Sequence, residues 1–192
     1  VTEIVASLRA GEVPEPALPQ EGLVYVSLQE LATRIAHHNT GKLVEDPVGY
    51  EVMKRVASDE NRHHLFYRDL SSAAREVDPS GTGAAIPAQV RDFEMPGTGI
   101  VDFDAHARAI ARAGIYDFQI HHDQILSPVV VRHWGIENLT GLSDAAERAR
   151  DALLTRIRRI RKAGERLARR RAEDGFGTGG RGTPRRSEEF AV

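Results

Sequence analysis

Residues 47–77, PVGYEVMKRVASDENRHHLFYRDLSSAAREV, carry the periodicity of a long amphipathic helix. Side chains recur there in alternating steps of three and four residues, at Met53, Val56, Glu60, His63 and Tyr67. This spacing places them along one stripe of the helix. Asp46 can cap the helix and Pro47 fits its first turn, so the sequence predicts a helix from Pro47 to about Val77.

Glu60 and His63 are the exceptions on this otherwise apolar stripe, which we expect to face the core. A carboxylate and an imidazole at core-facing positions are costly unless each has a partner, and one metal ion can satisfy both. Residues three apart on a helix can reach a common ion. Glu-x-x-His is also the ligand pair of di-iron four-helix bundles. Surface charges on a solvated helix are the alternative interpretation.

The preceding segment, predicted to be helical from Gly22 to Leu43, repeats the pattern. Its stripe consists of Leu23, Val26, Glu30, Thr33 and His37. Two antiparallel helices joined by a short loop would place Glu30 opposite Glu60 and His63. One glutamate from one helix and Glu-x-x-His from its neighbour are half of a di-iron ligand set.

Each polar residue on these stripes also has a structural interpretation. Glu30 could instead be a half-buried acid paired with Arg34 or Arg62. Thr33 could cap or pack rather than react. Three further histidines are expected at the surface or behind the ligands, because no acid completes a ligand pair with them: His37, His38 and His64.

The rest of the chain also reads as helical, because strand signals are scarce. Shorter helices are expected at 2–10, 83–93, 104–113 and 116–126, and a long one at about 143–172. A turn is expected at 78–81, Gly114 should end a helix, and Pro128 should interrupt the apolar run before Trp134. The predicted fold class is all-α, with a disordered tail at residues 174–192.

Composition narrows the possible chemistry. A chain of 192 residues can bury one main core, and its net charge of -2 gives no global attraction to nucleic acid. The absence of cysteine excludes disulfides, zinc-thiolate sites and iron-sulfur clusters, so a metal would need His, Asp and Glu ligands. No apolar run is long enough to span a bilayer and no signal peptide is evident, so a cytoplasmic protein without membrane contact is expected.

Three segments resemble soluble acyl-[acyl-carrier-protein] desaturases, and they occur in that family's order. Residues 25–40, YVSLQELATRIAHHNT, resemble the family's Thr-Ser-Phe-Gln-Glu-Arg-Ala-Thr motif and its continuation. Residues 58–63, SDENRH, are similar to the second of its two Glu-x-x-Arg-His motifs. Residues 132–143, RHWGIENLTGLS, resemble its Arg-Trp-x-x-x-x-Leu-Thr-Gly-Leu-Ser stretch, which an arginine-rich helix follows.

The resemblance implies that residues 1–173 are the C-terminal part of a ferritin-like helical bundle. Enzymes of this family use a di-iron centre and O₂ to insert a cis double bond into an acyl chain on acyl carrier protein, in fatty acid biosynthesis. The resemblance makes Glu30 a bridging or terminal carboxylate, Glu60 a bridging carboxylate and His63 a terminal nitrogen ligand of Fe²⁺.

Further roles and partners follow from the same resemblance. Asp59 and Arg62 would orient the ligands, and the Thr33 hydroxyl would lie beside the oxygen-binding face, where it could relay protons. The implied partners are acyl carrier protein with its acyl chain, a ferredoxin-type electron donor and a second subunit of a homodimer.

The departure from the family is that half of the ligands are missing. A complete site needs an earlier glutamate and an earlier Glu-x-x-His, from N-terminal helices that this sequence lacks, and Glu3 is not a convincing substitute. Three interpretations stay open. The favoured one is the C-terminal portion of a desaturase, inactive by itself. The others are a non-catalytic paralogue that serves as a binding or structural partner, and two chains that combine their half-sites.

The arginine-rich segment 156–171 is the remaining candidate for a binding surface. It could dock the acidic acyl carrier protein or be a plain solvated helix. Clustered arginines also attract nucleic acid phosphates, but aromatic stacking residues are absent from the segment, so nucleic acid is not the expected partner.

Overall fold

The computed structural model describes residues 18–95 and 100–176. Its helices are α2 (Pro19–Leu43), α3 (Pro47–Val77), α4 (Pro79–Arg91), α5 (Phe103–Arg112), α6 (Phe118–His121), the π-helix η1 (His122–His133), the 3₁₀ turn η2 (Ile136–Asn138) and α7 (Asp144–Phe176). Among these residues there is no β-strand, so the all-α prediction is confirmed. The helix predicted at 2–10, with Glu3, lies outside the described residues.

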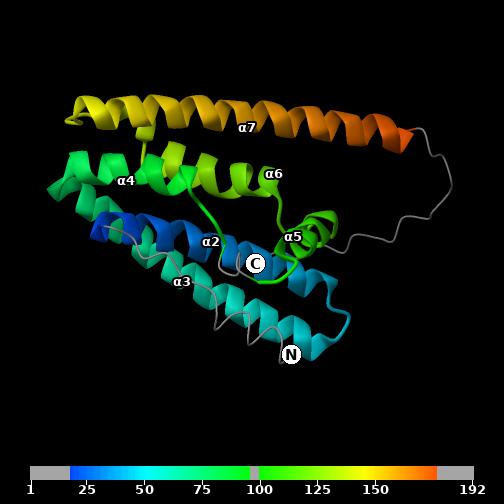
Figure 1. The fold of residues 1–192 in the computed structure, drawn as a ribbon. Coiled ribbons are helices and arrows are strands. Elements are labelled where there is room, and N and C mark those ends of the chain that lie inside the picture. The colour runs from blue at the N-terminus through cyan, green and yellow to red at the C-terminus, as the bar shows by residue number, and fades with distance from the viewer. Residues whose placement is uncertain (1–17, 96–99, 177–192) are drawn as a thin grey trace.

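The helices form three layers (Figure 1). Helix α7 is one outer layer, α4 with α6 and η1 is the middle layer, and the antiparallel pair of α2 and α3 is the other outer layer. The core lies between them and contains Val24, Leu28, Leu31, Ala32, Ile35, Ala85, Ile86, Val90, Ile125, Leu126, Val129, Val130, Trp134, Ile136, Leu153 and Ile157. None of the described helices has the length and apolar character needed to cross a bilayer.

Two Asp-Pro pairs begin helices by the same device. Asp46 accepts a hydrogen bond of 2.8 Å from the Gly49 amide, which confirms the predicted start of α3. Asp78 likewise accepts one of 2.8 Å from the Gly81 amide, and Pro79 occupies the first helical position of α4. The predicted turn at 78–81 is therefore wrong. A Cβ at Gly81 would collide with the carboxylate of Asp78, so a larger residue there would require this capping group to shift.

The region after α5 departs from the prediction in two places. Gly114, with a φ of +72°, follows the end of α5 as predicted. Pro128, however, does not interrupt the helical run before Trp134, because η1 continues through it in the wider π geometry, with hydrogen bonds spanning five residues. The final helix is also longer than predicted, since α7 extends to Phe176.

Helix α3 is buried along one narrow face only. Its buried residues are Ala57, His64 and Ser71, spaced seven apart, and two of them are small enough for α2 to approach closely. The described residues that make up the core include none from α3. Apolar side chains instead remain exposed along its outer side: Val48, Val52, Phe66, Leu70 and Val77. The predicted stripe with Glu60 and His63 lies at the border of the buried face, not at its centre.

Candidate metal centre

Glu30 on α2 and Glu60 and His63 on α3 converge at one point between the two helices. Each offers one ligand atom, and these atoms all lie within 4.8 Å of one another. Nδ1 of His63 is 3.2 Å from Oε2 of Glu30 and 3.7 Å from Oε2 of Glu60. The antiparallel packing of α2 and α3 therefore brings together the three residues that the two stripes singled out.

Water reaches the cluster from one side. The side chains of Glu30 and Glu60 are 15% and 21% exposed, whereas that of His63 is 57% exposed. Burial raises the pKa of Glu30 to about 7, with a hydrogen bond and charge repulsion from Glu60 adding to the effect. The two carboxylates repel each other at this separation, and a bound cation would relieve that repulsion.

His37, two turns after Glu30 on α2, also lies beside the cluster. Its Nε2 lies 3.7 Å from Oε1 of Glu60, so the two oxygens of Glu60 each face an imidazole. The sequence placed His37 on the Glu30 stripe, seven residues along, but gave no reason to connect it with Glu60. That seven-residue spacing, which returns to the same helix face after two turns, is the signal that could have identified it.

Three other predicted site residues have partners outside the cluster. The Thr33 hydroxyl donates to the carbonyls of Gln29 and Glu30, at 3.2 and 3.0 Å, and so bonds to its own helix. Arg62 donates to Asp59 across 2.6 Å, and both side chains are largely exposed.

The alternative pairing of Glu30 with an arginine is not what the structure shows. Among the described residues, the ion pairs of Glu30 and Glu60 are with His37 and His63, and neither Arg34 nor Arg62 takes part in them.

The remaining two histidines of these helices behave differently from each other. His38 is exposed, as predicted. His64 is buried, with its Nδ1 2.9 Å from the Ser27 carbonyl oxygen, so of its two predicted positions the one at the surface is wrong. Burial lowers the pKa of His64, which favours the neutral ring as a hydrogen-bond donor between α2 and α3.

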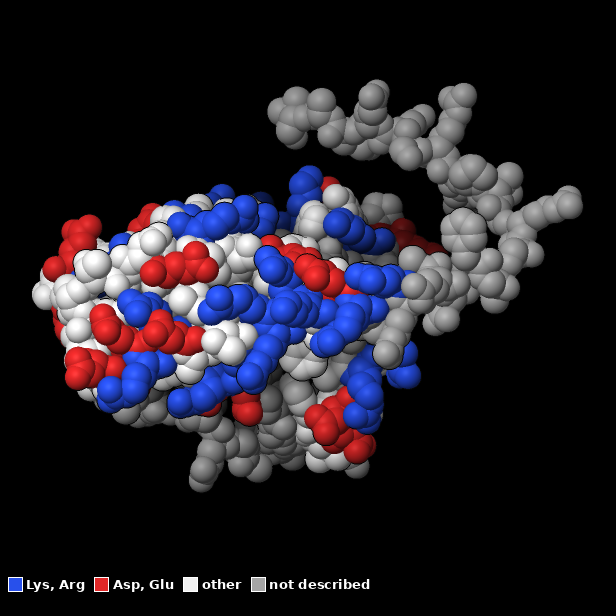
Figure 2. Space-filling model, turned by 90° about the horizontal axis from the view of Figure 1, so that it is seen from above, with Lys and Arg blue, Asp and Glu red and all other residues white. Residues whose placement is uncertain are grey.

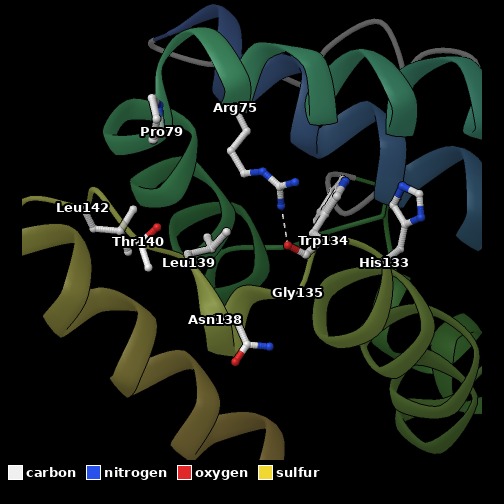
Figure 3. Close-up of a pocket in the computed structure, with 9 residues that line it drawn as sticks. All are labelled: Arg75, Pro79, His133, Trp134, Gly135, Asn138, Leu139, Thr140 and Leu142. Atoms are coloured by element: carbon white, nitrogen blue, oxygen red, sulfur yellow. Dashed lines mark hydrogen bonds between the residues drawn. The ribbon is translucent and has the colours of Figure 1, made fainter.

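The third family-like segment lines a separate pocket of about 420 Å³ at the end of α3 (Figure 3). It is lined by Arg75, Pro79, His133, Trp134, Gly135, Asn138, Leu139, Thr140 and Leu142. Arg75 extends into it and donates to the Trp134 carbonyl, while the Trp134 indole N–H points to the Arg68 carbonyl at 3.4 Å. None of the cluster residues lines this pocket, so these contacts attach the 134–142 segment to α3.

The donor set of the cluster fits a divalent transition metal. Two carboxylates and one imidazole are ligands that Fe²⁺, Mn²⁺ and Zn²⁺ accept. The acids are held close together without a lysine or arginine among their ion pairs in the described part of the chain. The residues present are therefore compatible with Fe²⁺.

Comparison with known sequences places these observations in one family. Residues 4–176 match the Fatty acid desaturase family. DesA1 of Mycobacterium tuberculosis, named as an acyl-[acyl-carrier-protein] desaturase, is 38% identical over 143 residues, covering 74% of this chain and 42% of DesA1. The chloroplastic stearoyl-[acyl-carrier-protein] 9-desaturase of Simmondsia chinensis is 34% identical over 158 residues, covering 77% and 39%.

A solved structure supports the same placement at the level of the fold. DesA2 of Mycobacterium tuberculosis H37Rv superimposes with a TM-score of 0.59 at 22% identity, over 74% of this chain and 56% of that one. This likeness confirms the ferritin-like helical fold. The chain spans 42% and 39% of the two relatives named above. It belongs to the fatty acid desaturase family, and its relatives in that family are acyl-[acyl-carrier-protein] desaturases.

Proposed function

We propose that this chain is part of an acyl-[acyl-carrier-protein] desaturase of fatty acid biosynthesis and supplies half of its di-iron ligand set. The observation that carries the proposal is the convergence of Glu30, Glu60 and His63 within a member of this family. The names of the relatives support the substrate class.

Glu30, Glu60 and His63 would hold the metal, with Nδ1 of His63 as the nitrogen donor. Bound Fe²⁺ would supply the O₂-dependent oxidising power that removes hydrogens from two adjacent methylenes. The proton that Glu30 retains near neutral pH must leave when an ion binds, so metal binding releases a proton. His37 and His63 hold the two oxygens of Glu60 from opposite ends of the carboxylate.

Thr33 remains the proposed proton relay. Its hydroxyl donates to the backbone carbonyl of Glu30 at 3.0 Å, and the carboxylate of the same residue belongs to the cluster. To act as a relay, the hydroxyl would have to leave this bond by rotation about χ1. Asp59 and Arg62 are proposed to act through the position of α3, because their ion pair lies one residue from Glu60 and from His63.

The proposed docking surface for acyl carrier protein is the outer face of α7. Figure 2 shows basic side chains gathered over this helix. They are the exposed residues Arg156, Arg158, Arg159, Arg161, Lys162, Arg166 and Arg169. Glu165 is the acid within this stretch, and it pairs with Arg161 at 3.6 Å. An excess of exposed cations suits an acidic carrier protein.

A charge reversal tests this surface. Arg159→Glu should weaken acyl carrier protein binding at low salt by about tenfold, whereas Arg108→Glu, an equally exposed change on α5, should leave it unchanged. Equal effects of both variants, or stronger binding of DNA than of acyl carrier protein at the same salt concentration, would count against the surface.

A ferredoxin-type electron donor, a cytoplasmic location and a homodimer complete the proposal. A monomer of this chain, with half of the ligands, is expected to form no double bond. The alternative is a non-catalytic desaturase-like paralogue that acts as a binding or structural partner.

Iron binding separates the two. Chelator-treated protein should bind Fe²⁺ under anaerobic conditions, and Glu60→Gln should weaken this binding at least tenfold, while the exposed control Glu51→Gln should not. Fe²⁺ binding that Glu60→Gln leaves unchanged would reject these residues as ligands and favour the paralogue.

A further inference from the structure

The pocket at the end of α3 holds a positive charge that no described acid balances. Figure 3 shows the Arg75 side chain reaching from α3 to the centre of this pocket, between Leu139 and Trp134. Among the described residues, its hydrogen-bond acceptor is the Trp134 carbonyl. None of the ion pairs between described side chains includes Arg75.

The guanidinium of Arg75 can therefore bind more than the Trp134 carbonyl. A guanidinium group carries five N–H donors, so one carbonyl leaves most of them without an acceptor in the described part of the protein. Its planar fork matches the two oxygens of a carboxylate or phosphate group, which it can bind through two parallel hydrogen bonds. Water could accept the same hydrogen bonds, but only an anion would also balance the charge.

The other charged groups near the pocket do not supply that balance. Asp69 pairs with Arg68 at 2.7 Å, and the same oxygen lies 3.8 Å from Nε2 of His133. Burial lowers the pKa of His133, and the charges of Arg68 and Arg75 lower it further against the opposing charge of Asp69. At neutral pH the His133 ring is therefore uncharged. The described lining contains no acid, so Arg75 sets its charge.

The size and the walls of the pocket indicate the rest of the ligand. A volume of about 420 Å³ lies in the range of small-molecule sites, and one carboxylate or phosphate group would leave most of it empty. Pro79, Leu139 and Leu142 supply apolar wall. The exposed Thr140 hydroxyl also lines the pocket and is a further hydrogen-bonding group.

We propose that this pocket binds a small organic oxyanion, with its carboxylate or phosphate group on Arg75 and its apolar part against Pro79, Leu139 and Leu142. Arg75 follows His63 by twelve residues, which is about 18 Å along α3. The site is therefore separate from the metal centre, and the inference does not depend on iron binding.

Calorimetric titration of the full chain at fixed ionic strength tests the proposal, with sodium phosphate and sodium hexanoate as separate probes. At least one probe should bind with a Kd of about 1 mM or tighter, and Arg75→Gln should weaken this binding at least tenfold. Arg108→Gln is the matched control, because Arg108 is an exposed arginine on α5, and it should leave the binding unchanged.

A second variant separates anion binding from the structural bond of Arg75. Arg75→Gln also removes the hydrogen bond to the Trp134 carbonyl, whereas Thr140→Glu keeps Arg75 and adds a carboxylate to the lining of the pocket. Thr140→Glu should weaken binding of either probe at least tenfold, because its carboxylate competes for the guanidinium and repels anions.

The two probes also distinguish the ligand classes. Binding of phosphate alone would support a phosphate ligand, and binding of hexanoate alone would support a carboxylate with an apolar tail. No binding of either probe at about 10 mM would overturn the proposal. So would binding that Thr140→Glu leaves unchanged, or binding that Arg108→Gln weakens as much as Arg75→Gln does.

Discussion

Replacing Glu30 with glutamine should stabilise the metal-free protein at alkaline pH. The pKa of Glu30 is raised from an ordinary value of 4.5 to about 7, so the folded protein binds more protons than the unfolded chain between these values. Stability must then fall as pH rises through this window. The loss is absent below about pH 4.5 and complete above about pH 7. Glutamine cannot ionise, yet its amide can still donate to Glu60.

The size of the stability gain in Glu30→Gln follows from the shift in the pKa of Glu30. One pH unit corresponds to about 1.4 kcal/mol, so ionised Glu30 destabilises the fold by at most about 3 kcal/mol. Water on the side of the half-exposed His63 screens the two carboxylates, so we expect a gain of about 1 to 2 kcal/mol near pH 8. The same substitution should weaken Fe²⁺ binding at least tenfold, because it removes a charged ligand.

Urea unfolding in the presence of a chelator, from about pH 4.5 to about pH 8, measures this gain. Glu51→Gln is the control, because Glu51 is an exposed acid on α3 beside Lys54, and its effect should stay within about 0.5 kcal/mol. A Glu30→Gln variant that is no more stable than wild type near pH 8 would refute the reasoning. So would a gain of equal size at every pH, since it would not come from ionisation.

Three further predictions concern other parts of the structure. His37→Gln should weaken Fe²⁺ binding by about 10- to 100-fold in equilibrium dialysis, because His37 holds Oε1 of Glu60, whereas the same change at the neighbouring exposed His38 should not. Trp134→Ala should lower the free energy of unfolding in urea by about 3 to 5 kcal/mol, because the side chain is 2% exposed, while Phe118→Ala should change it by under about 0.5 kcal/mol. Burial lowers the pKa of His121 from 6.5 to about 4, so stability should fall by about 3 kcal/mol as pH drops through that window, and His121→Gln should remove most of this slope.

Helix identity and the ends of α3 could be predicted because local signals determine them. Asp46 followed by Pro47 caps α3 through a contact between residues three apart, and the three-four spacing of apolar residues sets the helical period. The same reasoning failed at Asp78 and Pro79, because an Asp-Pro pair begins either a turn or a helix. Helix α4 packs against α2 and α7, and these contacts between distant segments are not visible in the local Asp-Pro pair.

In the candidate site, too, some features follow from local sequence and others from contacts between helices. That Glu30, Glu60 and His63 lie on helical stripes at ligand spacing follows from the sequence, because the period of a helix is a property of the backbone. The rotation of α3 against α2, which exposes His63, buries the adjacent His64 and brings His37 to Glu60, depends on how the two helices pack. Neighbouring residues differ in direction by about 100° around a helix, so a small rotation changes which of them is buried. The helical period fixes the directions of side chains relative to one another. The side chains packed between two helices determine which of those directions faces the neighbouring helix.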